Sequence, residues 1–95
     1  LLLSPAVPIT AFPVGDPPSR IGGQEINPFW GYVQFTAIIN GIGCPAASIP
    51  CGLSRDGLPI GLHIVGRPGD EAAVIAASAA FEEARPWANI RARVS

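Results

Sequence analysis

Three side chains in the middle of the sequence, Ser54, Asp56 and His63, have the types that build a serine hydrolase triad. We expect them in a β-hairpin whose pairing puts His63 about 13 Å along the sheet from Ser54. The segment around Ser54 also lacks the second glycine of a nucleophile elbow. Ser48 is diagonal to His63 on the same face, yet a lone histidine on a strand is more often a structural residue. These residues therefore do not predict a triad.

The other reactive side chains do not form a metal or acid–base site. Cys44 and Cys51 lack C-x-x-C spacing, and with one histidine they cannot supply the four ligands of structural zinc. We expect both thiols to be reduced. Glu82 and Glu83 are adjacent, so on a helix they project about 100° apart and do not act as one carboxylate pair. Residues 66–69 precede a helix, but without G-x-G-x-x-G spacing an ordinary turn is favoured over an anion site. We predict no metal and no cofactor.

The composition is typical of a piece that is buried within something larger. The chain has 95 residues, of which 14% are charged, against roughly 25% in ordinary soluble domains. Small domains need relatively more polar surface, so this low charge favours burial against other parts of a protein. The sequence contains neither Met nor Lys, and we expect it not to be a complete translation product.

Charge and hydropathy also argue against two classes of partner. The formal net charge is −1 without a basic run, which disfavours nucleic acid and anionic membrane surfaces. Residues 26–54 are uncharged, but the prolines among them break any single helix, so we expect no membrane span. Leu1–Leu3 open the chain without the basic region of a signal peptide. We expect a cytoplasmic protein.

The predicted fold class is α/β, with a long loop over residues 5–27, a β-hairpin over residues 47–65 and two helices. Leu1–Ser4 is typical of the end of a buried strand, and Pro5 stops it. The loop is rich in proline and lacks periodicity, and such loops are either functional walls or plain surface coil.

Asn27 and Pro28 are typical of a helix start, so we expect the first helix over residues 28–40, ending before Gly41. It is apolar on nearly all faces, which indicates an interior helix. One face carries Trp30, Val33 and Ala37. These three form either a pocket wall or plain core, and the periodicity favours neither.

Asp56-Gly57 is a strong signal for a two-residue hairpin turn. A turn there aligns two rows of aliphatic side chains on one face, and the predicted pairs are Leu53–Ile60, Cys51–Leu62 and Ile49–Ile64. Asp70 caps the second helix, over residues 70–85, which ends at Arg85-Pro86. Its predicted apolar stripe is Val74, Ile75, Ser78 and Phe81. We expect Trp87 to anchor the tail.

Short motifs follow one another through the chain in a specific order. Phe35-Thr36, Asn40 and Gly43–Ala46 match a run F-T-x-x-x-N-x-x-G-x-P-A. The hairpin looks like S-V-P-x-G-L, with Ile49 in place of Val, followed by D-G-L-P-x-G-L. The opening Leu2–Pro5 and the later Asp70-Glu71 fit the same series. Together these motifs resemble the amidase signature family over essentially the whole chain. His63 stands where that family commonly has Gln, and Cys44 where Leu or Gln is usual.

The resemblance implies a mixed β-sheet flanked by helices, of which residues 1–95 are the C-terminal portion. It implies hydrolysis of amide C–N bonds by a Ser–cis-Ser–Lys triad that lies upstream. A chain without lysine lacks the base, so no catalytic residue is assigned and the chain alone is expected to be inactive. In family members the first helix lines the substrate channel, so the resemblance assigns Trp30, Val33 and Ala37 to a pocket wall. Members that use glutamine for transfer-RNA amidation have an acidic site at the position of Val33, which counts against a glutaminase function.

The partners implied are the N-terminal remainder of the amidase and a small-molecule amide, while a homodimer stays open. The alternative function is a non-catalytic amidase-like piece that serves as a structural or interaction module. A Gly-Gly-Ser-Ser-Gly stretch and a lysine upstream would favour the enzyme.

Overall fold

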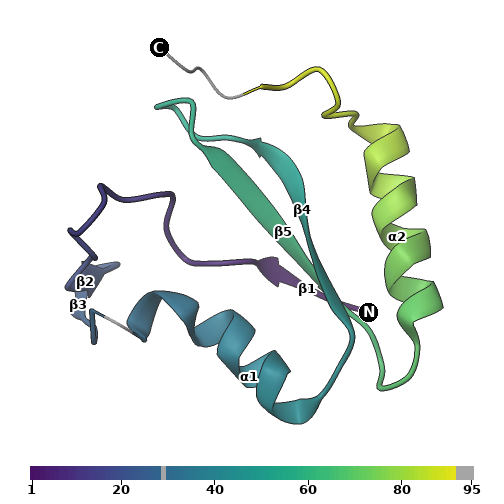
Figure 1. Ribbon diagram of the computed structural model, residues 1–95, viewed down its shortest axis with the longest axis horizontal. Coiled ribbons are helices and arrows are strands. Elements are labelled where there is room, and N and C mark those ends of the chain that lie inside the picture. The colour runs from purple at the N-terminus through teal and green to yellow at the C-terminus, as the bar shows by residue number, and fades with distance from the viewer. Residues whose placement is uncertain (29, 92–95) are drawn as a thin grey trace.

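The structure, a computed structural model, describes residues 1–28 and 30–91. Its elements are β1 (Leu2–Pro5), β2 (Arg20–Ile21), β3 (Gln24–Glu25), the 3₁₀ helix η1 (Gly31–Val33), α1 (Gln34–Ile42), β4 (Ala46–Leu53), β5 (Pro59–Val65) and α2 (Glu71–Ala84). Strands β1, β5 and β4 form, in that order, a sheet whose pairings are antiparallel. Helix α2 packs on β4 and β5, and α1 lies on the other side of the sheet (Figure 1). The predicted α/β class is confirmed.

A small core lies between α2 and the sheet. Its buried centre is Ile49, Ile64 and Val74, and the partly buried side chains packed against it are Ala47, Leu62, Ala77, Phe81 and Trp87. The prediction that Trp87 anchors the tail is confirmed. Ile75 was predicted in the apolar stripe of α2, but it is 68% exposed. Ala77 takes its place, because residues at i, i+3 and i+7 from Val74 share one side of a helix.

The predicted cap of α2 is confirmed. A carboxylate oxygen of Asp70 accepts a hydrogen bond from the N–H of Ala73 at 3.3 Å, which satisfies one of the free donors at the helix start. Glu71 lies in the first turn, where a negative charge complements the helix dipole.

The hairpin of β4 and β5 differs in register from the predicted one. Ile49 lies opposite Leu62 and Ala47 opposite Ile64, so the predicted Ile49–Ile64 and Cys51–Leu62 pairs are wrong. The residue numbers of each predicted pair sum to 113, whereas those of the observed pairs sum to 111 from Ala46 to Pro50 and to 112 at Gly52 and Leu53. A shift by an even number keeps each side chain on its face, so Ile49, Leu62 and Ile64 still point toward α2.

Ser54 closes the hairpin turn and explains the first step of the shift, from a residue sum of 113 to one of 112. Its N–H donates to the carbonyl of Leu58 at 2.8 Å, and its Oγ accepts from the N–H of Leu58 at 3.1 Å, leaving a three-residue loop. The predicted two-residue turn at Asp56-Gly57 requires positive φ at both residues. Gly57 has a φ of 80°, but in the described chain only glycines have positive φ, so Asp56 does not fit that turn.

A β-bulge at Cys51 explains the second step of the register shift, from a residue sum of 112 to one of 111. The register changes between the residues on either side of Cys51, which is therefore the extra residue of β4. Beyond the bulge Leu53 lies opposite Pro59, so the predicted Leu53–Ile60 pair is wrong as well. Leu53 consequently falls on the face away from α2 and is 49% exposed.

The turn can be tested with Gly57→Ala. We expect this change to lower the free energy of unfolding by about 1 kcal/mol, because alanine adopts a left-handed φ only with strain. Gly41→Ala is the matched control, since Gly41 lies inside α1 with open space where a Cβ would go, and alanine there is neutral or stabilises by about 0.5–1 kcal/mol. Urea denaturation of both variants measures the difference. Equal effects at the two positions would contradict the left-handed φ of Gly57.

The first helix begins later and ends later than predicted. The Oδ1 of Asn27 accepts from the N–H of Trp30 at 3.3 Å, but a 3₁₀ turn follows and regular α-helix begins only at Gln34. The helix continues through Gly41 and ends at Gly43, whose φ of 73° suits the left-handed position after a helix.

Large apolar side chains stay exposed on β1 and α1. Leu1–Leu3 are 59–68% exposed, although the sequence predicted a buried strand. In α1 only Ile39 is buried, whereas Phe35, Ile38 and Ile42 are 37%, 64% and 60% exposed. The prediction of an interior helix is therefore wrong for the described chain alone, because none of its own elements covers that surface.

The segment between β1 and η1 is a loop that contains one short ribbon. Strands β2 and β3 pair antiparallel and are joined by Gly22-Gly23, both with positive φ, as a type I′ turn requires. Phe12 contacts Tyr32 of η1 edge-on, with ring centroids 5.1 Å apart. This aromatic pair holds the loop against the start of α1.

Candidate functional site

The three residues predicted to line a pocket lie around the start of α1. Trp30 precedes η1 and is 71% exposed, Val33 ends η1 and is half-buried, and Ala37 is exposed within α1. The carbonyl of Trp30 accepts from the N–H of Val33 at 3.1 Å, which fixes the backbone between them. Trp30 and Val33 are three residues apart, which is one 3₁₀ turn, and Val33 and Ala37 are four apart, which is about one α-helical turn. All three side chains therefore lie on one side of the helix axis. Their role as a pocket wall stays a prediction.

His63 lies in the central strand with 5% exposure, opposite Ser48 of β4 and Ser4 of β1. The predicted register makes Ser48 diagonal to His63, and the observed register places it directly opposite. The Nδ1 of His63 has no hydrogen-bond partner among the described residues, so it activates no hydroxyl there. The Oγ of Ser54 serves the hairpin turn instead. These residues form no triad.

Within residues 1–28 and 30–91, no group of three or more His, Cys, Asp or Glu side chains could hold a metal ion. Cys44 and Cys51 are unpaired, half-buried thiols, and the Sγ of Cys51 donates to the carbonyl of Ile60 at 3.5 Å. None of the helices in the described part of the chain combines the length and the apolar character needed to cross a bilayer.

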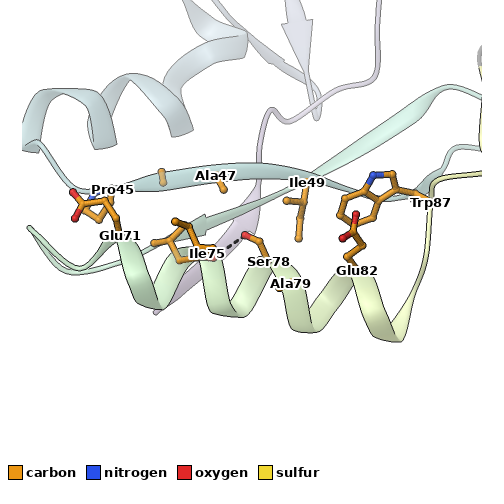
Figure 2. Close-up of a pocket in the computed structure, with 11 residues that line it drawn as sticks. Pro45, Ala47, Ile49, Glu71, Ile75, Ser78, Ala79, Glu82 and Trp87 are labelled. Carbon is orange, nitrogen blue, oxygen red and sulfur yellow. Dashed lines mark hydrogen bonds between the residues drawn. The ribbon is translucent and has the colours of Figure 1, made fainter.

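An open groove of about 480 Å³ runs between β4 and α2 (Figure 2). Ala47 and Ile49 of β4 point toward the helix, Pro45 lies beside Glu71 at one end, and Trp87 lies beside Glu82 at the other. The lining residues are Pro45, Ala46, Ala47, Ile49, Glu71, Val74, Ile75, Ser78, Ala79, Glu82 and Trp87. The hydroxyl of Ser78 donates to the carbonyl of Val74 at 2.7 Å, and the charged side chains of the lining are Glu71 and Glu82.

This groove was missed from the sequence because Ile75 was placed in the core. The signal was available: Val74 and Ile75 are adjacent, so on a helix they project about 100° apart and only one of them can point straight at the sheet. Val74 is 4% exposed and faces the sheet, which leaves Ile75 beside it in the groove.

A second hollow, of about 740 Å³, lies between the hairpin turn and the tail. Its charged lining consists of Arg55, Asp56, Arg85 and Arg91. The guanidinium of Arg91 donates to the backbone carbonyls of Ala88 and Ile90, so it is already engaged by the tail itself.

Comparison with known proteins identifies related sequences. A family model described as Amidase matches residues 1–75. A glutamyl-tRNA(Gln) amidotransferase subunit from Thermodesulfovibrio yellowstonii is 39% identical over 88 residues, which cover 90% of this chain and 17% of that protein. The corresponding protein from Granulibacter bethesdensis is 46% identical over 83 residues, 87% of this chain and 16% of its own length.

A solved structure is also similar. The crystal structure of a bacterial aryl acylamidase of the amidase signature family matches with a TM-score of 0.77 and 44% sequence identity, covering 90% of this chain and 18% of that one. The chain spans less than a fifth of the length of each of these relatives. Since the family model covers most of the chain and the structural match agrees with it, the chain belongs to the amidase signature family.

Proposed function

We propose that this chain is the C-terminal part of an enzyme that hydrolyses carboxylic amide C–N bonds. The observation that carries the proposal is the family match over residues 1–75 in a chain shorter than a fifth of its relatives. The catalytic Ser–cis-Ser–Lys triad would then lie on the rest of the parent enzyme, meaning the longer protein that contains this chain. In the reaction the acyl–nitrogen bond breaks, the acyl carbon gains the oxygen of water, and the amine leaves with a proton.

The chemistry of this chain supports a triad located elsewhere. The sequence has no lysine. The single histidine is buried, and Ser54 serves a turn. What the chain contributes under this proposal is the wall formed by Trp30, Val33 and Ala37, which would face the acyl part of the substrate. We also place the parent enzyme in the cytoplasm, where unpaired thiols such as those of Cys44 and Cys51 stay reduced.

The test uses the parent enzyme, whose intact mass first shows how much chain accompanies these residues. We expect the purified parent to release amine and acid in equal amounts from a simple anilide, and to lose this activity when its upstream lysine is replaced. A parent that carries neither that lysine nor a Gly-Gly-Ser-Ser-Gly stretch, and that turns over no amide, would instead be a structural or interaction module.

A further inference from the structure

The groove between β4 and α2 is an apolar surface without a partner in the described chain. Ile75 projects into it with 68% of its surface exposed, beside the buried Val74. Trp87 closes one end and Pro45 lies at the other (Figure 2). Exposed apolar surface of this kind, rimmed by charge, is typical of a contact site.

The charges at the rim are all of one sign. Glu71 and Glu82 are exposed and line the two ends of the groove. They are eleven residues apart on α2, which corresponds to about 16 Å along the helix axis. Helix α2 contains no basic residue. A segment that fills the groove is therefore favoured if it is apolar in its middle and carries a cation near each end.

Two kinds of occupant are disfavoured. The N–H of Gly66 donates to the carbonyl of Pro45, so the backbone groups of Pro45 point toward β5. In an antiparallel ladder this direction alternates from one residue to the next, so the backbone groups of Pro50, five residues further on, point to the free edge of β4. Proline offers no N–H there, which hinders addition of another strand. A second copy that packs α2 against α2 in antiparallel fashion would place Glu71 of each copy beside Glu82 of the other, and like charges repel.

We infer that the groove is filled by a helix of the parent enzyme from outside this chain, apolar along its centre and with a Lys or Arg near each end. This inference rests on the proposed function, which makes the chain one part of a longer polypeptide. More than four-fifths of the length of its relatives lies outside the chain, so an intramolecular partner is available at high effective concentration. Such a helix covers Ile75 and pairs with Glu71 and Glu82.

Charge reversal tests the ends of the groove. In the parent enzyme, E82R is expected to lower the melting temperature by several degrees, because it places a cation against a cation, although a basic residue in the last turn of α2 suits the helix dipole. E83R is the matched control, since Glu83 is exposed on the same helix but does not line the groove. Equal melting temperatures for E82R and E83R would overturn the charge pairing.

Thiol labelling tests whether the groove is covered and by what. In the parent enzyme, the thiol of I75C is expected to react with a maleimide at least about tenfold more slowly than that of A80C, which lies on α2 outside the groove, because labelling then requires local opening. The protection should be the same in dilute and concentrated protein. Equal rates would show an open groove, and protection only in concentrated protein would show a second copy; either result overturns the inference.

If I75C does not fold, hydroxyl-radical footprinting of the unaltered parent tests in the same way whether Ile75 is covered. Ile75 is then expected to be oxidised at least about tenfold less than in the unfolded parent, and unprotected Ile75 overturns the inference. Amide hydrolysis by the same samples separates the two claims. If the parent is active and its I75C thiol is reactive, only the docking helix is contradicted. If the parent is inactive and its I75C thiol is protected, only the proposed function is contradicted.

Discussion

The isolated 95-residue chain is expected to release no detectable aniline from a chromogenic anilide under conditions in which the parent enzyme is active. The chain lacks lysine, its one histidine is buried, and no described serine hydroxyl is paired with that histidine. Without a nucleophile and its base the rate falls toward that of the uncatalysed reaction, a loss of about 10⁶-fold or more. Continuous measurement of the absorbance of the released aniline gives the rate.

The control for this result is Ser48→Ala. Ser48 lies opposite His63, so it is the hydroxyl to exclude as an unexpected nucleophile. Activity of the isolated chain that survives Ser48→Ala would mean that the chain carries catalytic groups of its own, contrary to the proposal that these lie upstream. Activity that disappears with Ser48→Ala would point to a nucleophile on β4 and contradict the proposal equally.

The parent enzyme is expected to prefer amides with an apolar or aromatic acyl part over glutamine. Trp30, Val33 and Ala37 offer apolar surface and no charge to pair with an ammonium or carboxylate group. Val33→Asp should lower kcat/KM for an aromatic amide by about 10²-fold or more, because an unpaired carboxylate beside an apolar group costs several kcal/mol and about 1.4 kcal/mol corresponds to tenfold in rate. Steady-state kinetics on an aromatic amide and on glutamine provide both comparisons.

Val33→Thr serves as the matched control, since it keeps the branched shape without adding a charge. The melting temperature of the parent with Val33→Asp should stay close to that of the unaltered protein if the position borders a cavity. Unfolding by Val33→Asp would show that Val33 is sealed in the core and would remove the pocket wall while leaving the family unchanged. A preference for glutamine over an aromatic amide would contradict the substrate class.

Much of the local structure follows from neighbouring residues. The alternation of aliphatic side chains around Ile49 and Ile64 predicted which of them share a face, because successive side chains of a strand point to opposite sides. Asp70 predicted the start of α2, since its short carboxylate reaches a free N–H one turn further on. The motifs in their order predicted the family, and the match over residues 1–75 confirms it.

The pairing of the strands was decided by the tertiary structure. Ser54 closes a three-residue turn, and Cys51 forms a bulge, and together these move every pair of the hairpin away from the predicted register. Neither feature has a signal as strong as Asp56-Gly57, and each depends on backbone angles that the alternating pattern does not encode.

Burial was also decided beyond the local sequence. The apolar pattern of Leu1–Leu3, of α1 and of Ile75 predicted that these side chains would be covered, and in the described chain they are exposed. A pattern of side chains specifies that a surface is apolar, but which segment covers that surface depends on elements distant in the chain or outside it. The sequence by itself determined the shared face of Ile49, Leu62 and Ile64, the cap of α2 and the family, whereas the register, the groove and the exposed surfaces arise only when the strands and helices pack in three dimensions.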